Sequence, residues 1–283
     1  MSATSNIPQD KIPLPKLLAR KIEKKKIICL TAADYPVARL IDEAGIDLIL
    51  VGDSLAMTRL GYSTTVPVTM TEMLVHLRAV RRAVQKAFLV ADMPFGSYHV
   101  SQKTAMQNAV RLIKEGGAEA IKLEGGRKRA RLIQRLVEAE IPVMGHIGLT
   151  PQSVHAMGGY KVQGRTPEQA QELIDDALTL QEIGVFSIVL EGIPEELAKE
   201  ITTTLRIPTI GIGAGLHCDG QILVTEDLLG LTFTKKPKFV RQYANLQEII
   251  SEALRHYAED CRNGDFPSRA ESYSLAPTNA SMG

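Results

Sequence analysis

The chain has 283 residues, 45% of them hydrophobic and 23% charged, with a formal net charge of +1. This length and apolar content suffice for one large core, while the near-zero charge and scarce aromatic residues speak against a nucleic-acid or membrane-surface partner. Three widely spaced cysteines support neither a zinc site nor a disulfide framework, and without a signal peptide or a membrane-spanning run we expect a soluble cytoplasmic protein.

The predicted elements alternate between strands and helices along the chain. After a loose tail that ends near Ile12, a lysine-rich amphipathic helix is expected over 13–26. Short apolar runs predict strands at 27–31, 47–51, 88–92, 118–124, 141–146, 186–190, 207–212 and, last, 228–231. Helical patterns lie between them at 36–44, 69–85, 101–115, 127–139, 167–183 and 194–205, with a closing helix at 239–262.

About eight strand–helix units therefore follow one another without a break in composition. This regularity favours a TIM (β/α)8 barrel with an extra N-terminal helix, and an open doubly wound sheet is the structural alternative. We expect one barrel domain over 1–263. The end of the chain, 264–283, is rich in Ser, Ala, Pro and Asn and is expected to be a disordered tail.

Four of the predicted strands run into a carboxylate at their carboxyl ends, and these carboxylates are Asp53, Asp92, Glu124 and Glu191. In a barrel these ends share one face, where active sites form, so the four acids should meet at one mouth. Two bare carboxylates about 4 Å apart repel each other by roughly 4 kcal/mol at an effective dielectric of ~20. The pattern thus calls for a metal ion, a lysine or protons.

Lys122 precedes Glu124 by two residues, so both side chains point to the same side of their strand. Asp53, Asp92 and Glu124 come from neighbouring strands, and this all-oxygen set suits Mg²⁺ or Mn²⁺ rather than zinc. Such an ion would bind a 2-keto acid through a carboxylate oxygen and the keto oxygen. Glu191 lies across the mouth, free of this cluster, in a place that suits a general base.

Other residues are expected at the same mouth. Ser54 follows the second strand, and His146, at the end of the fifth, either contacts a ligand or is a satisfied buried histidine. The long glycine-containing loop 147–165 predicts a lid with its hinge at 158–159. For the glycine-rich segment 211–215, close backbone packing near a ligand is favoured over phosphate binding.

The residues described so far resemble the ketopantoate hydroxymethyltransferase family. The likeness keeps its order and spacing from about Ile27 to Tyr243. The matching segments are GDSL at 52–55, DMPFGSY at 92–98, IKLEGG at 121–126, HIGLTPQS at 146–153, VQGRT at 162–166, IGIGAG at 210–215, CDGQ at 218–221 and PKFV at 237–240.

The resemblance implies a barrel of the phosphoenolpyruvate/pyruvate superfamily and a specific reaction. In this reaction, 5,10-methylenetetrahydrofolate donates a hydroxymethyl group to 3-methyl-2-oxobutanoate, which gives 2-dehydropantoate for pantothenate and coenzyme A synthesis. The residues implied are Mg²⁺ ligands Asp53, Asp92 and Glu124, keto-acid contacts Asp53, Ser54, Asp92 and Lys122, and the proton acceptor Glu191. The resemblance also implies a cytoplasmic homo-oligomer, often a decamer.

Three positions depart from the family pattern: Ala56 stands for the usual glycine, Gly192 for cysteine and Leu216 for proline. None removes a functional group, so we expect them to affect loop geometry only. Two alternatives stay open, a carbon–carbon lyase of the same superfamily and a catalytically inactive binding barrel. The first would carry a cysteine loop that this chain lacks, and the second would not need the charged residues intact.

Overall fold

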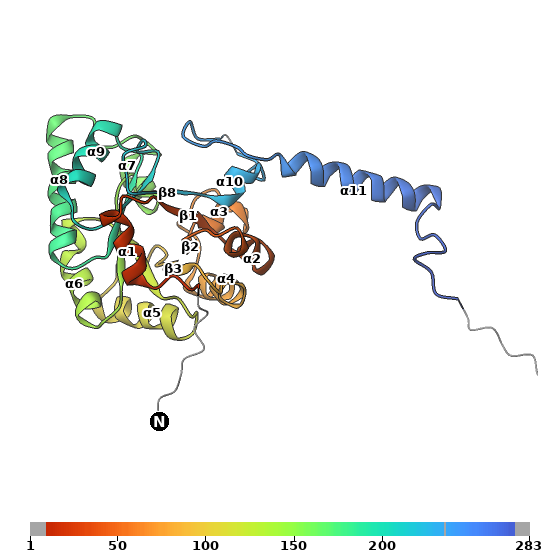
Figure 1. Ribbon diagram of the computed structural model, residues 1–283, viewed down its shortest axis with the longest axis horizontal. Coiled ribbons are helices and arrows are strands. Elements are labelled where there is room, and N and C mark those ends of the chain that lie inside the picture. The colour runs from red at the N-terminus through yellow and green to blue at the C-terminus, as the bar shows by residue number, and fades with distance from the viewer. Residues whose placement is uncertain (1–9, 235, 275–283) are drawn as a thin grey trace, which may run out of the picture.

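The computed structural model describes residues 10–234 and 236–274. Eight parallel strands close into a barrel in chain order (Figure 1), which confirms the predicted TIM-type fold. The strands are β1 (Ile27–Thr31), β2 (Leu48–Val51), β3 (Phe88–Asp92), β4 (Ala120–Glu124), β5 (Val143–Gly148), β6 (Ser187–Glu191), β7 (Thr209–Ile212) and β8 (Gly220–Leu223). Because β1 pairs with β8, with Cys29 opposite Ile222, the alternative of an open sheet is wrong.

Helices surround the barrel between these strands. The longer ones are α1 (Leu14–Ile22), α2 (Tyr35–Glu43), α4 (Met70–Ala83), α5 (Gln102–Lys114), α6 (Ala130–Glu138), α8 (Pro167–Glu182), α9 (Glu195–Thr204) and α11 (Leu246–Asn263). Short turns of helix are α3 (Leu55–Thr58), η1 (Arg127–Arg129), η2 (Pro151–Ser153), α7 (Val154–Met157) and α10 (Thr225–Leu229). Among the described residues, no helix combines the length and apolarity that a bilayer span requires.

The last strand was predicted in the wrong place, at 228–231 instead of Gly220–Leu223. The apolar residues Leu228 and Leu229 end the short helix α10, which stops at Gly230 in a left-handed conformation. A strand of four residues that begins with glycine carries little apolar signal. The glycine is required there, because a Cβ on Gly220 would lie 2.4 Å from the carbonyl oxygen of Ile27.

The barrel interior is apolar below the predicted site. Side chains from several strands fill it, and Leu17 of α1, only 1% exposed, packs against them at the end where the chain enters. The interior side chains include Val90, Ala120 and Met144. Since strand side chains alternate, the residues two positions further on, Asp92, Lys122 and His146, continue the same inner face.

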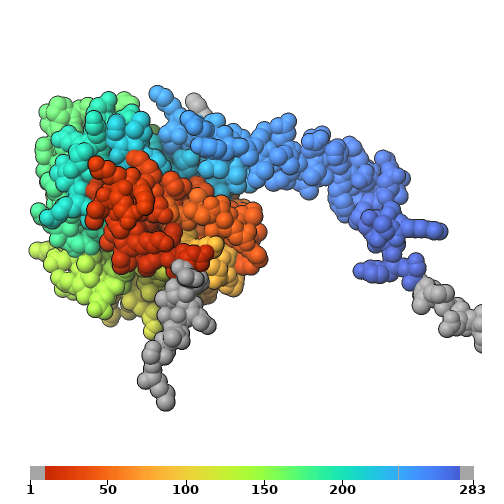
Figure 2. All heavy atoms as spheres, viewed as in Figure 1, coloured from red at the N-terminus to blue at the C-terminus, as the bar shows by residue number. Residues whose placement is uncertain are grey.

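The C-terminal helix α11 stands away from the barrel (Figures 1 and 2), and none of its residues is buried. Its start at Leu246 is seven residues later than the predicted 239. Beyond it, residues 264–274 are exposed and form no helix or strand. The rest of the expected tail, 275–283, lies outside the described residues, as does the start of the N-terminal tail.

Candidate active site

The strand-end acids come together at one end of the barrel. Asp92 ends β3, Glu124 ends β4 and Glu191 ends β6, while Asp53 follows β2 by two residues. Asp92 lies directly opposite Lys122 on the neighbouring strand. Asp53, Asp92 and Glu124 are each at most 5% exposed, so they are withdrawn from bulk water.

Lys122 forms the central ion pair of this cluster. Its Nζ lies 2.8 Å from Oδ1 of Asp92 and 3.4 Å from Nδ1 of His146. Burial alone favours the neutral amine, but the carboxylates of Asp92, Glu124 and Asp53 outweigh it and raise the pKa of Lys122. The lysine therefore stays charged and balances one of the buried carboxylates.

Among the residues that the structure describes, no lysine or arginine forms an ion pair with Asp53 or Glu124. Burial, followed by the negative charge of Asp92, raises the pKa of Asp53 to about 7. Burial and the charge of Asp53 likewise raise the pKa of Glu124 well above its usual range. Lys122 lowers the pKa of both groups, but a single positive charge does not balance three ionised carboxylates.

This surplus and the all-oxygen donors fit a hard divalent cation such as Mg²⁺. Within 10–234 and 236–274, no three Asp, Glu, His or Cys side chains already stand as a coordination cluster. The fit therefore rests on donor chemistry and charge, not on a preassembled set of ligands.

His146 and Glu191 form the second part of the site. Nε2 of His146 lies 3.2 Å from Oε2 of Glu191 without forming a hydrogen bond to it. Burial and the charge of Lys122 lower the pKa of His146, so the imidazole is neutral. The side chain of Glu191 is 15% exposed, against 4% for Glu124, which leaves it the more open to a ligand in the mouth.

Ser54 lies beside this cluster at the start of α3. Its hydroxyl makes no capping hydrogen bond with that helix. A Cβ added to Gly52 would lie 3.1 Å from Oγ of Ser54 and 3.5 Å from Oδ2 of Asp92. The Ser54 hydroxyl and the Asp92 carboxylate thus both lie beside Gly52.

The predicted lid, 147–165, is largely structured, since it holds the end of β5, η2 and α7. The half-buried Tyr160 follows α7, and its hydroxyl lies 3.9 Å from Sδ of Met57. Burial, followed by the charges of Asp53 and Glu191, raises the pKa of Tyr160. Gly158 and Gly159 have φ angles of 65° and 110°, but their role as a hinge stays a prediction.

The glycine segment 211–215 is closely packed. A Cβ on Gly211 would lie 2.9 Å from Sγ of Cys218, and one on Gly213 would lie 2.7 Å from the ring of Phe239. This agrees with the expected close backbone packing.

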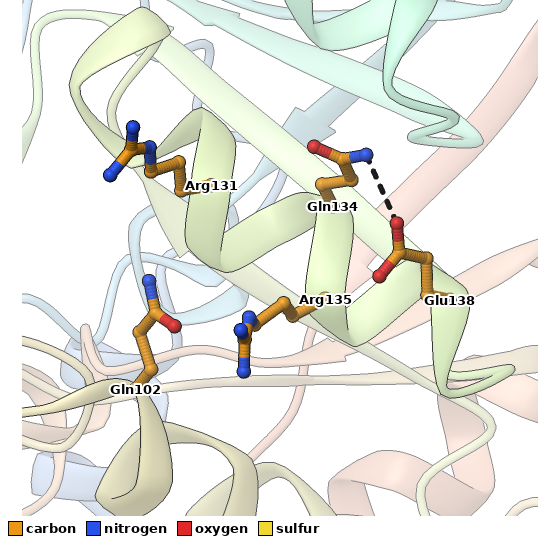
Figure 3. Close-up of a pocket in the computed structure, with 5 residues that line it drawn as sticks. All are labelled: Gln102, Arg131, Gln134, Arg135 and Glu138. Atoms are coloured by element: carbon orange, nitrogen blue, oxygen red, sulfur yellow. Dashed lines mark hydrogen bonds between the residues drawn. The ribbon is translucent and has the colours of Figure 1, made fainter.

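The hollow drawn in Figure 3 is separate from this site. It measures about 400 Å³ and lies on the outside of the barrel between α5 and α6, where its lining includes Arg131, Arg135 and Glu138. None of the predicted site residues lines it.

Gln152 was missed by sequence reasoning, although it lies in the middle of the site. It is 4% exposed and hydrogen-bonded to both Asp53 and Glu124. The one signal for it in the sequence was its place six residues after His146, in the loop after the fifth strand.

A parallel barrel with buried acids and a charged lysine at the carboxyl ends of its strands is the architecture of an enzyme. The family profile described as ketopantoate hydroxymethyltransferase matches residues 11–269. The chain belongs to this family.

Curated relatives agree with this assignment. The 3-methyl-2-oxobutanoate hydroxymethyltransferase of Koribacter versatilis (strain Ellin345) is 58% identical over 97% of this chain and 93% of its own length. The enzyme of the same name from Thermoanaerobacter sp. (strain X514) is 53% identical over 94% of this chain and 97% of its own.

Solved structures of lower identity share the fold. A phosphonopyruvate hydrolase in complex with oxalate and Mg²⁺ matches with a TM-score of 0.59 and 14% identity, over 93% of this chain and 92% of its own. A 2,3-dimethylmalate lyase of the PEP mutase/isocitrate lyase superfamily matches with a TM-score of 0.57 and 12% identity, over 90% of this chain and 89% of its own.

Proposed function

We propose that this chain transfers a hydroxymethyl group from 5,10-methylenetetrahydrofolate to 3-methyl-2-oxobutanoate, which gives 2-dehydropantoate in pantothenate biosynthesis. Family membership and the names of its relatives support the reaction class and the keto acid. The observation that carries the proposal is the buried cluster of Asp53, Asp92, Lys122 and Glu124 beside Glu191.

Asp53, Asp92 and Glu124 are the residues that would hold Mg²⁺. When bound, the ion supplies Lewis-acid chemistry that polarises the keto group of the substrate. The raised pKa values of Asp53 and Glu124 support this role, because they report carboxylates whose charge lacks a partner.

Lys122 and Ser54 then bind and orient the keto acid. The keto oxygen of the substrate gains negative charge as the enolate forms. The positive charge of Lys122 stabilises that oxygen and so lowers the free-energy barrier to enolate formation. The hydroxyl of Ser54, which makes no capping hydrogen bond with α3, donates a hydrogen bond to the substrate carboxylate. His146, neutral and beside Lys122 and Glu191, contributes to the same pocket.

Glu191 accepts the proton from C3 of the keto acid. The methylene carbon starts with one bond to each of two folate nitrogens. A bond to the enolate carbon replaces one of them, a bond to an oxygen atom from water replaces the other, and the two nitrogens take up the proton from C3 and a proton from that water. Tetrahydrofolate is released. Glu191 suits this task because it is the most exposed carboxylate of the group and stands apart from the proposed metal ligands.

The test is formation of 2-dehydropantoate by the purified enzyme from the keto acid and methylenetetrahydrofolate. We expect turnover with Mg²⁺, loss of turnover after treatment with EDTA, and recovery when Mg²⁺ is restored. A protein that forms no product, or that cleaves 2-keto diacids instead, would contradict the proposal.

We further propose that the enzyme works in the cytoplasm as a homo-oligomer, with a decamer as the expected assembly. The apolar side chains that α11 exposes, Ile249, Ile250, Leu254 and Tyr257, support self-association.

A further inference from the structure

Gln152 uses all the hydrogen-bonding capacity of its side-chain nitrogen at the site. Nε2 donates to Oδ2 of Asp53 at 2.8 Å and to the carbonyl oxygen of Met93 at 3.0 Å. The backbone N–H donates to Oε2 of Glu124 at 3.1 Å. The amide oxygen accepts from the hydroxyl of Tyr98 at 2.6 Å. One residue thus connects the end of β4 with the loops that follow β2 and β3.

The orientation of this amide is determined by its partners. If the group were flipped, its oxygen would face the carbonyl oxygen of Met93, which has no hydrogen to donate. The Tyr98 oxygen is itself fixed, because it accepts from the backbone N–H of Glu124 at 3.3 Å. The guanidinium of Arg129 lies 5.4 Å from the centre of the Tyr98 ring and packs over it.

In both Asp53 and Glu124, one carboxylate oxygen accepts a hydrogen bond from Gln152 and the other does not. Asp53 keeps Oδ1 and Glu124 keeps Oε1, the atom that lies 3.6 Å from Nδ1 of His146. A carboxylate with one oxygen held by a fixed donor presents the other in a single direction. Such outer partners orient metal ligands and are commonly as important as the ligands themselves.

We propose that Gln152 is a positioning residue that holds Asp53 and Glu124 in the orientation required to bind a divalent cation. This rests on the proposed function, in which both acids are metal ligands. Tyr98 has the same positioning role, because its hydroxyl donates to the amide of Gln152 and accepts from the backbone N–H of Glu124.

The test measures Mn²⁺ binding to the full-length protein by electron paramagnetic resonance, without substrate. Gln152→Met keeps the length of the side chain and the backbone N–H, and it removes both side-chain donors and the acceptor. We expect the Kd for Mn²⁺ to rise by about 10- to 100-fold.

Gln181→Met is the matched control. The amide oxygen of Gln181 accepts from the backbone N–H groups of Arg206 and Ile207, which precede β7 at the opposite end of the barrel. This variant should lower the melting temperature and leave the Kd unchanged, which separates loss of stability from loss of positioning.

Tyr98→Phe supplies a second, milder change. It keeps the ring under Arg129 but removes the hydroxyl, so we expect a smaller rise in the Kd for Mn²⁺, about 3- to 10-fold. If Gln152→Met does not fold, this variant decides the question.

A folded Gln152→Met protein, or a Tyr98→Phe protein, that binds Mn²⁺ as the wild type does would overturn the positioning role alone. A wild-type protein that binds no Mn²⁺ would overturn the proposed metal site, and the positioning role with it.

Discussion

At the scale of single residues, Glu191 is the group on which proton transfer depends. Glu191→Gln keeps the size of the side chain and removes its ability to accept a proton, so we expect kcat to fall by ~10²–10⁴. Affinity for the keto acid should stay close to that of the wild type, because Glu191 is not a proposed metal ligand. Exchange of the C3 proton with deuterated water, followed by NMR, isolates this step from folate chemistry.

Glu195→Gln is the control for that change, since Glu195 lies nearby on α9 but its side chain is 46% exposed and faces His217. Wild-type exchange in Glu191→Gln would rule out Glu191 as the base and would make His146 the better candidate.

Asp53 gives a prediction about pH in the metal-free enzyme. Its pKa is about 7 when folded and near its ordinary 3.8 when unfolded, so between these values the folded state binds more protons. The contribution of Asp53 to stability is therefore greatest below pH 4 and is lost as the pH rises towards 7. Asp53→Asn should raise the melting temperature in EDTA at pH 8, and much less at pH 5.

Adding Mg²⁺ should raise the melting temperature of the wild type at pH 8 and not that of Asp53→Asn, because a bound ion stabilises only the protein that holds it. Equal responses to Mg²⁺ in the two proteins, measured by calorimetry, would contradict the role of Asp53 as a ligand.

The strand-end acids were predictable and Gln152 was not, for a physical reason. The position of an acid at the end of an apolar strand is determined by the strand. The carboxyl ends of parallel strands meet at one face of the barrel, independently of the conformation of the loops. The partners of Gln152 depend instead on how the turn η2 folds back over the barrel. Its contact with Asp53 spans 99 positions in the sequence, which no local pattern reveals.

At the scale of the element, the loop 147–165 is expected to close over the mouth when substrates bind. Limited proteolysis near the half-exposed Tyr160 should slow in the presence of the keto acid and methylenetetrahydrofolate together, because closure buries the backbone. Cleavage in the exposed segment 264–274 serves as the internal control and should not change. Equal rates of cleavage near Tyr160 with and without substrates would contradict a lid.

Strands β1 to β7 were found from their apolar runs, whereas β8 was not. Its residues Gln221 and Leu223 are only partly buried, so the strand lacks the continuous apolar pattern of its neighbours. It forms because the closed barrel provides partners on both sides, β1 and β7. Closure of this kind is a property of the whole sheet and leaves little trace in four residues.

At the scale of the whole molecule, the apolar side chains of α11 are not buried against the barrel. The helical pattern of 246–263 is the same whether the helix packs on its own barrel or on another chain, so the sequence could predict the helix and not its place. In proteins, most of the stability of a helix comes from the packing of its apolar face against other parts of the molecule. Yet its 18 residues include none that is buried.

We therefore expect the apolar side chains of α11 to be covered by another copy of this chain. Replacing Ile250 and Leu254 by aspartate places two charges on that surface, at positions that are 44% and 63% exposed here. The mass in solution, measured by light scattering after size-exclusion chromatography, should fall to that of a smaller assembly or a monomer.

Val100→Asp, at a residue 78% exposed on the barrel, controls for the general effect of an added surface charge. Because Asp53, Lys122 and Glu191 all come from one barrel, each subunit holds a full set of these groups, and proton exchange at C3 should survive dissociation. An unchanged mass in the double variant would show that α11 does not mediate assembly.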